Sequence, residues 1–245
     1  MIGESKMTFK HANILGYSFI NTTFDKFMDQ IKNDSTQHQN RFIITANPEI
    51  VMYARKHPDY QKLVQTADYL TPDGIGIVKA SQTLGDPIPD RITGFDIFNN
   101  LLEWGNDNQK SVYLLGSKPE VIQKTVQKIQ TDYPDLKIAG FHDGYFKDDA
   151  PIITEIENTK PDFVFVATGF PKQEEFITTN RHISDSIWMG VGGSFDVYSG
   201  TVKRAPTFWQ EHHLEWFYRL ITDPKRLKRQ LVIPQFMWVV WRSKK

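Results

Sequence analysis

The chain has 245 residues, of which 40% are hydrophobic and 24% are charged, a composition that fits a soluble folded protein and excludes a disordered one. Cysteine is absent, which excludes disulfides and thiolate metal sites and suits a reducing compartment. Residues 1–10 contain no apolar run of the kind found in signal peptides, and no stretch approaches the roughly 20 apolar residues of a membrane span. We therefore expect a cytoplasmic protein that, if it meets a membrane, lies on the inner face.

The formal net charge of zero hides an asymmetry between the two ends of the chain. Residues 201–245 contain ten basic and three acidic side chains, so this segment carries +7 and residues 1–200 carry −7. The same segment holds four of the six tryptophans: Trp209, Trp216, Trp238 and Trp241. Indole favours the headgroup layer and cations favour anionic lipid, so this composition predicts a membrane-interface segment. The alternative is a pair of docked C-terminal helices with a solvated basic face.

Five segments predict β-strands, and two of them, 41–46 and the β-branched and aromatic run at 163–168, predict buried ones. In chain order they are residues 41–46, 111–116, 137–141, 163–168 and 187–191. Helix-length segments such as 121–131 and 174–182 separate them, and Asn47-Pro48-Glu49 and Ser117-Lys118-Pro119-Glu120 are typical helix starts. The alternation predicts an α/β fold, in which a mostly parallel Rossmann-like sheet carries helices on both faces.

The one shift in composition falls near Gly200, so we predict a core of residues 1–200 and an appendage of residues 201–245. In the appendage, apolar residues are spaced as one face of an amphipathic helix: Phe208, Leu214, Phe217, Leu220 and Ile221. Asp223-Pro224 ends that pattern, a basic turn follows at 225–229, and an apolar segment at 236–241 closes the chain. We therefore expect a helical appendage that associates with the membrane.

Polar residues follow the strand predicted at 163–168, where Gly169-Phe170-Pro171 leads into Lys172, Gln173 and Glu174. Pro171 suits the start of a helix, which places the three polar side chains in its first turn. Open α/β sheets bind their ligands at this carboxyl end of the strands. An ordinary strand–helix junction would have the same sequence pattern, so the segment alone does not decide between the two.

Two glycine-containing segments are further candidates for a ligand site. Asp73 lies in the turn 71–76, where Gly74 and Gly76 allow close approach of a backbone, and Asp196 lies in the glycine segment 190–196. Neither segment completes the G-x-G-x-x-G dinucleotide fingerprint, so the sequence does not support a nicotinamide site. A less specific glycine loop that binds a nucleotide stays an open alternative. As alternatives, Asp73 would only form a turn and Asp196 would only begin a helix.

Metal signatures are absent from the sequence, which has neither an Asp-x-Asp pair nor an HExxH motif. If the protein binds a diphosphate, arginine must supply the positive charge that a metal ion supplies in other enzymes. Arg219, Arg226 and Arg229 are available, and guanidinium groups suit phosphate oxygens. A solvated basic face is the alternative for these three residues.

Seven short motifs follow one another along the chain. They are TANPE at 45–49, PDG at 72–74, RITG at 91–94, GFPKQE at 169–174, GVGG at 190–193, KRAP at 203–206 and EWFYR at 215–219. With these motifs the chain closely resembles the WecG/TagA/CpsF family of bacterial glycosyltransferases, from about Asn13 to the C-terminus. Within that family, the match is closest to the branch that makes wall teichoic acid.

The resemblance implies a specific reaction. The family enzyme of that branch moves N-acetylmannosamine from UDP-N-acetylmannosamine to the 4-hydroxyl of N-acetylglucosamine on undecaprenyl diphosphate. It forms a β-1,4 link with inversion and needs neither a metal nor another cofactor. The implied partners are therefore the UDP-sugar, the lipid-linked acceptor and the membrane surface.

The resemblance also assigns roles to residues. Asp73 matches the family's proposed general base, and we group Thr45 and Gln173 with it as catalytic residues. Matches to substrate-binding positions are Asn47, Arg91, Asp196 (near the uridine), Arg219, Arg226 and Arg229. The three arginines match those thought to fold over the site and meet the UDP diphosphate. To this set we add Lys172, whose place in its motif would let its ammonium approach phosphate.

Several alternatives stay open. A relative with another donor, such as the uronic-acid form of the sugar or a different hexose, would share the same motifs. A non-catalytic nucleotide-sugar-binding or lipid-binding protein is disfavoured by Asp73, Thr45 and Gln173. We expect no nucleic acid as partner, because residues 1–200 are acidic and carry no recognised binding motif. Soluble homo-oligomers and an active membrane-bound monomer are both compatible with the sequence.

Overall fold

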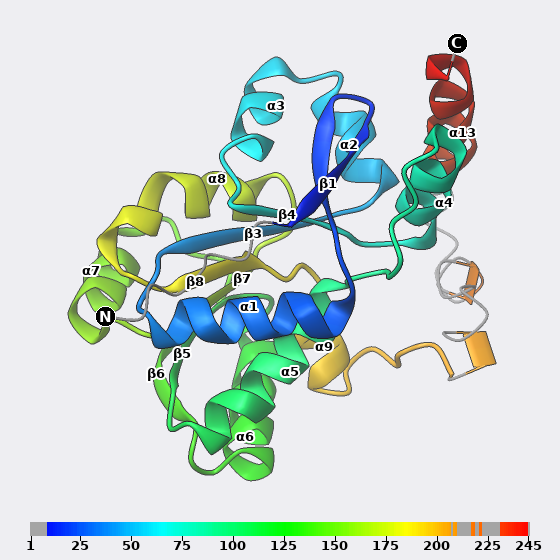
Figure 1. The fold of residues 1–245 in the computed structure, drawn as a ribbon. Coiled ribbons are helices and arrows are strands. Elements are labelled where there is room, and N and C mark those ends of the chain that lie inside the picture. Colours follow the sequence, from blue (N-terminus) through cyan, green and yellow to red (C-terminus); the bar gives the residue numbers. More distant parts are fainter. Residues whose placement is uncertain (1–8, 207, 210–216, 219–220, 222–230, 245) are drawn as a thin grey trace, which may run out of the picture.

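The protein is described by a computed structural model, which covers residues 9–206, 208–209, 217–218, 221 and 231–244. Its centre is a six-stranded sheet in which every neighbouring pair of strands is parallel (Figure 1). From edge to edge the order is β4 (Tyr69–Pro72), β3 (Arg41–Ala46), β8 (Ile187–Gly190), β7 (Phe163–Ala167), β5 (Ser111–Gly116) and β6 (Lys137–His142). The predicted α/β fold with a parallel, Rossmann-like sheet is confirmed.

The strands separate two apolar clusters, because successive side chains point to opposite faces of a sheet. In β5, Tyr113 and Leu115 join one cluster, whereas Val112 and Leu114 join the other. All four side chains are fully buried. This burial on both faces explains why the strands are continuous apolar runs in the sequence rather than alternating ones.

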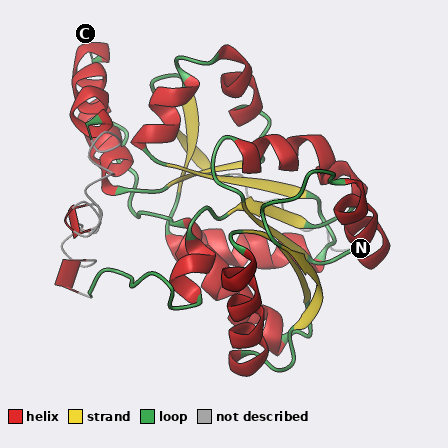
Figure 2. Cartoon of the chain, turned by 180° about the vertical axis from the view of Figure 1, so that it is seen from behind, coloured by secondary structure: helices red, strands yellow, loops and turns green. Residues whose placement is uncertain are grey.

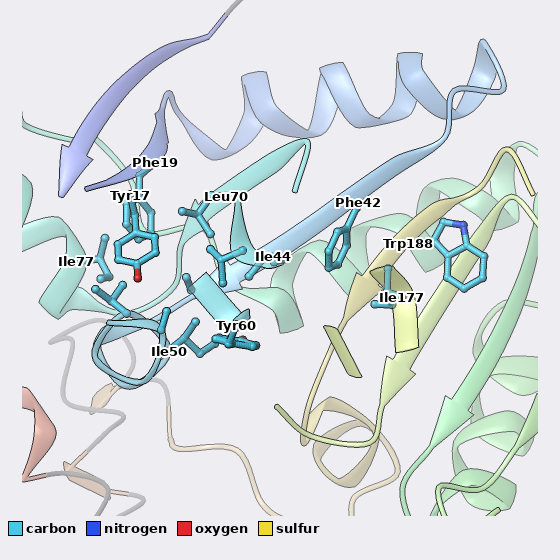
Figure 3. Close-up of a cluster of buried hydrophobic side chains, with 14 of the residues drawn as sticks. Tyr17, Phe19, Phe42, Ile44, Ile50, Tyr60, Leu70, Ile77, Ile177 and Trp188 are labelled. Carbon is cyan, nitrogen blue, oxygen red and sulfur yellow. The ribbon is translucent and has the colours of Figure 1, made fainter. Parts of the chain in front are cut away.

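Helices cover both faces of the sheet, as Figure 1 shows and Figure 2 repeats from behind. One face carries α1 (Phe24–Thr36), α5 (Gly94–Asp107), α6 (Pro119–Asp132) and α9 (Ser194–Tyr198). The other carries α2 (Pro48–Ala54), α3 (Pro58–Val64), α4 (Ile75–Leu84), α7 (Ala150–Thr159), α8 (Lys172–Asn180) and α13 (Val232–Ser243). Figure 3 shows the cluster on this second face, where Ile50, Ile77 and Ile177 come from three of its helices.

A two-stranded antiparallel hairpin, β1 (Lys10–Ile14) and β2 (Tyr17–Asn21), lies beside β4. Its two-residue turn has positive φ at both positions, 55° at Leu15 and 90° at Gly16, as hairpins with right-handed twist require. The hairpin adds the buried rings of Tyr17 and Phe19 to the apolar cluster (Figure 3).

The five predicted strands are all present. The bounds of β3 and β5 are as predicted, and those of β6, β7 and β8 differ by one residue at the carboxyl end. The helix predicted at 174–182 begins two residues earlier, at Lys172, and gives way after Asn180 to a 3-10 turn, Arg181–Ile183. The sequence analysis did not predict β4 or the hairpin.

The C-terminal helix α13 shares a core with the rest of the chain. Phe236 and Val240 are fully buried in the cluster of the second sheet face, where α13 lies against α2 and α4. The division at residue 200 stays a prediction, and this packing shows that part of the appendage is built into the core. Most of the amphipathic helix predicted around 208–221 lies outside the described residues. None of the helices in the described part of the chain is long and apolar enough to cross a membrane.

Candidate active site

Two predicted site residues follow neighbouring strands at the carboxyl edge of the sheet. Asn47 comes directly after β3 and Asp73 directly after β4. The Asp73 N–H donates to the carbonyl oxygen of Ala46 at 3.0 Å, which continues the ladder between the two strands. The backbone therefore holds these two residues side by side.

The helices that start here are crowded together. Asn47 caps α2, with its Oδ1 accepting the Ile50 N–H at 3.0 Å. Gly74 has φ of +107°, a conformation that residues with a side chain rarely adopt, and a Cβ on Gly76 would lie 2.7 Å from Cγ of Pro48. The glycines noted in the sequence thus let the start of α4 approach the start of α2, which holds the Asp73 backbone in place.

The segment 91–94 closes this half of the site. The Ile92 N–H donates to the Pro72 carbonyl at 3.0 Å, and the Ile92 carbonyl accepts the Thr71 hydroxyl at 3.2 Å. A Cβ on Gly94 would lie 3.0 Å from Oγ1 of Thr45, so the Thr45 hydroxyl faces the start of α5. The structure therefore brings Thr45, Asn47 and Asp73 together and ties the segment that carries Arg91 to the same edge.

Gln173 lies farther along the edge, after β7. Its side chain is almost fully buried, with Nε2 donating to Oε1 of Glu174 at 2.7 Å and Oε1 accepting the Gly192 N–H at 3.1 Å. A Cβ on Gly190 would lie 2.5 Å from this Nε2. Glycine at 190 therefore leaves the space that the Gln173 side chain occupies, and a larger residue there would have to displace that side chain.

Glu174 is a buried carboxyl with a raised pKa. It is 2% exposed, and desolvation by burial raises its pKa to about 7, against the hydrogen bond from Gln173, which lowers it. Its other oxygen, Oε2, is buried and has no hydrogen-bond partner among the described residues. Burial raises the pKa of Tyr60, which lies in the apolar cluster of Figure 3, and the negative charge of Glu174 raises it further.

Asp196 lies at the far end of the site, on α9. Its Oδ2 accepts the Ser117 hydroxyl at 3.3 Å, and Ser117 directly follows β5. The loop after β6 crosses the same place, since the Gly144 N–H donates to the Ser117 carbonyl at 2.8 Å. In that loop the Tyr145 side chain is 71% exposed.

The site residues fall into two groups along one edge. The first group, which includes Asn47 and Asp73, lies at the ends of β3 and β4. The second group, Gln173, Asp196 and Ser117, lies beyond the ends of β7, β8 and β5. The strands β4 and β5 are four strand spacings apart, roughly 19 Å. The strands β3 and β8 are neighbours in the sheet. After β3 the chain continues to α2 on one face of the sheet, and after β8 it continues to α9 on the other face. Such a reversal is where open α/β sheets bind ligands, and the edge is long enough for a ligand with two parts.

The remaining predicted residues are placed as follows. Lys172 is exposed in the first turn of α8. Arg219, Arg226 and Arg229 lie outside the described residues. The KRAP motif contributes a different arginine, since Nη2 of Arg204 pairs with Oδ1 of Asp96 at 2.8 Å and its guanidinium lies 4.6 Å from the Phe95 ring centre.

Sequence reasoning missed two residues of this edge. Ser117 was seen only as part of a helix start, although a polar residue directly after a predicted strand was a usable signal. Glu174 was quoted in its motif without a role, and only the folded structure shows its burial and its contact with Gln173. In the described part of the chain, no three His, Asp or Glu side chains are grouped so as to hold a metal ion. Metal independence stays a prediction.

The fold is α/β, and the carboxyl edge of its parallel strands is the place where proteins with such open sheets bind ligands. Residues 12–245 match the family described as Glycosyl transferase WecG/TagA/CpsF family. The chain belongs to this family of glycosyltransferases, as the motifs of its sequence led us to expect.

Named relatives match the chain over nearly its whole length. Three of them carry the name N-acetylglucosaminyldiphosphoundecaprenol N-acetyl-beta-D-mannosaminyltransferase. The protein of Bacillus spizizenii is 41% identical over 93% of this chain and 89% of its own length, and that of Bacillus subtilis is 42% identical over 93% and 90%. The protein of Staphylococcus aureus is 39% identical over 100% of this chain and 98% of its own.

Proposed function

We propose that this chain transfers N-acetylmannosamine from UDP-N-acetylmannosamine to the 4-hydroxyl of N-acetylglucosamine on undecaprenyl diphosphate. The product carries a β-1,4 link formed with inversion, and the reaction belongs to the synthesis of the wall teichoic acid linkage unit. The observation that carries the proposal is the nearly full-length similarity to three proteins named as N-acetylmannosaminyltransferases of N-acetylglucosaminyldiphosphoundecaprenol. The geometry of the carboxyl edge supports it.

The first group of site residues suits the chemistry of the acceptor. The acceptor oxygen forms a bond to C1 of the sugar while the bond from C1 to the diphosphate breaks, and the electron pair leaves with UDP. The acceptor hydroxyl must lose its proton as this happens, and a carboxylate next to it is a suitable base. In this proposal Asp73 takes the proton, and Thr45, Asn47 and Arg91 hold the sugars around it.

The second group suits the donor nucleotide. Asp196 and Ser117 offer a carboxylate and a hydroxyl that hydrogen-bond to each other, groups that suit hydrogen bonding to a ribose hydroxyl. The exposed ring of Tyr145 in the adjacent loop offers a surface for the uracil base. With the nucleotide here and the acceptor near Asp73, the diphosphate and the transferred sugar span the middle of the edge, near Gln173.

Charge on the departing UDP needs cations in the absence of a metal. Lys172, exposed at the start of α8, is one candidate within the described residues. Arg219, Arg226 and Arg229 are the others, in the role that the family resemblance gives them. Fixed cations of this kind stabilise the charge that develops on a leaving group.

The lipid-linked acceptor implies work at a membrane surface, and α13 offers a face for it. Leu231, Trp238 and Trp241 are each more than half exposed, and their spacing places them on one side of the helix, away from the buried Phe236 and Val240. The Arg242 guanidinium lies 4.7 Å from the Trp238 ring centre on that side. Tryptophan beside arginine is typical of a segment that lies in the headgroup layer.

This face is tested by binding to lipid vesicles. Replacing both tryptophans (Trp238→Ser and Trp241→Ser) should weaken binding to vesicles of anionic lipid by at least about tenfold, a loss of 1.4 kcal/mol. Phe141→Ser, which removes another exposed ring from β6 instead, is the control and should leave binding unchanged. Equal binding of all three proteins would contradict a membrane role for α13.

The reaction is tested with purified chain, a soluble analogue of the lipid-linked acceptor and three donors in parallel: UDP-N-acetylmannosamine, its uronic-acid form and UDP-glucose. We expect UDP release that depends on the acceptor with the first donor, at an unchanged rate when EDTA is added. Release with another donor only would move the chain to another branch of the family. Strong inhibition by EDTA would overturn metal independence, and no release with any donor would favour a binding protein.

A further inference from the structure

The Gln173 side chain is held from both sides of its amide. Nε2 donates to the Glu174 carboxylate at 2.7 Å, and Oε1 accepts the Gly192 N–H at 3.1 Å. The amide also lies against Gly190, where a Cβ would come within 2.5 Å of Nε2. Every one of these neighbours restricts how the amide is turned.

The carboxylate and the backbone N–H select the same orientation of the amide. A carboxylate only accepts, so it must face the NH2 group, and a backbone N–H only donates, so it must face the oxygen. Without the Glu174 side chain, the NH2 side would lose its hydrogen-bond acceptor in a site where Gln173 is only 6% exposed. Glu174 and the Gly192 N–H together therefore make one of the two amide orientations strongly preferred.

The hydrogen bond from the Gly192 N–H also connects the Gln173 side chain to the turn that leads into α9. Gly192 has φ of +50°, the Val191 N–H donates to the Val166 carbonyl at 2.8 Å, and the Ser194 N–H donates to the Val191 carbonyl at 3.0 Å. Gln173 thus ties the start of α8 to the same turn. Two residues after Ser194, α9 carries Asp196, which bonds Ser117 at the other end of the edge.

We propose that Glu174 is a positioning residue of the active site: its carboxylate fixes the orientation of the Gln173 amide and, through Gly192, the turn that leads to Asp196. This inference rests on the proposed function, in which Gln173 lies at the transferred sugar. Glu174 itself is buried, so it acts through Gln173 and not on the substrate.

Packing alone does not account for a carboxylate here. Glu174 is 2% exposed, its Oε2 has no hydrogen-bond partner among the described residues, and burial raises its pKa to about 7. An apolar side chain of similar size would avoid the cost of removing a carboxylate from water. We therefore expect that Glu174→Met does not destabilise the fold, although it removes the acceptor from the Gln173 amide.

The test compares Glu174→Met, Glu174→Gln and the control Glu175→Gln, which makes the same change at the exposed next residue of α8. We expect kcat of Glu174→Met to fall on the order of 10- to 100-fold, as small misplacements in active sites do. Glu174→Gln should restore most of the rate, because its amide oxygen still accepts the Gln173 N–H. The Glu175 control should match the parent chain.

A second comparison asks whether Glu174 acts through Gln173. If it does, Gln173→Ala and the double variant with Glu174→Met should lose kcat by the same factor, because the second change removes nothing further. Losses that multiply in the double variant would overturn the proposal. Unfolding midpoints measured on the same proteins separate this effect from a loss of fold.

A structural readout keeps the proposal testable if no transfer is detected at all. In nuclear magnetic resonance spectra, Glu174→Met should shift the side-chain NH2 signals of Gln173 and speed hydrogen exchange at the Gly192 N–H, whereas Glu174→Gln should change neither much. No transfer by the parent chain would refute the proposed function alone. Unchanged exchange at Gly192 in Glu174→Met would refute the positioning role, whatever the activity.

Discussion

Asp73→Asn is expected to lower kcat on the order of 100- to 10,000-fold, the usual contribution of a general base, while UDP binding stays unchanged. Asparagine keeps the size of the side chain and the backbone N–H that donates to the Ala46 carbonyl, so the carboxyl edge should keep its shape. The amide cannot take the acceptor's proton, however. Turnover in the presence of saturating donor and UDP affinity by calorimetry together give both quantities.

The matched control is Asp59→Asn, the same change at a fully exposed side chain of α3 away from the site. It should leave both turnover and UDP affinity at the level of the parent chain. A near-normal rate for Asp73→Asn would remove Asp73 from the role of base. A loss of UDP binding equal to the loss of rate would make Asp73 a binding residue instead.

Phe236→Ala is expected to lower the free energy of unfolding by about 3–5 kcal/mol, the range found for buried phenylalanine. Phe236 is fully buried in the cluster between α13 and the helices α2 and α4, so its removal leaves a cavity in the core of the second sheet face. Denaturant unfolding of the two proteins measures the difference.

Trp238→Ala serves as the control because it removes a larger side chain from the same helix at a position that is 55% exposed. It should cost about 0.5 kcal/mol or less. If Phe236→Ala left the main unfolding transition unchanged, α13 would be an independent unit and the division at residue 200 would be supported. A large loss would mean that this part of the appendage stabilises the glycosyltransferase core.

The sequence predicted the four inner strands of the sheet and the edge strand β6, and missed the other edge strand, β4. Residues 41–46 and 111–116 are recognisable because a buried parallel strand is a continuous apolar run. The edge strand β4 is short and ends in Pro72, and of its residues only Thr71 and Pro72 were assigned, to a turn. The hairpin was missed because Leu15 occupies a left-handed turn position that Asn, Asp or Gly usually fills.

Only the parts of the candidate site that lie in recognisable sequence motifs could be predicted. Polar residues after predicted strands pointed to the carboxyl edge, and the structure does bring Thr45, Asn47 and Asp73 together there. Contacts such as that between Gln173 and Gly192 depend on the order of the strands, in which β8 lies between β3 and β7. No pattern within one segment fixes that order, so these contacts required the folded chain.

The most direct measurement is the structure of the product that the parent chain makes from UDP-N-acetylmannosamine and the acceptor analogue. Mass spectrometry and nuclear magnetic resonance of the isolated product report the added sugar, its anomeric configuration and the acceptor position. The account predicts one added N-acetylmannosamine, β-linked to the 4-hydroxyl of N-acetylglucosamine. An α-linked product, another acceptor position or unmodified acceptor would contradict it.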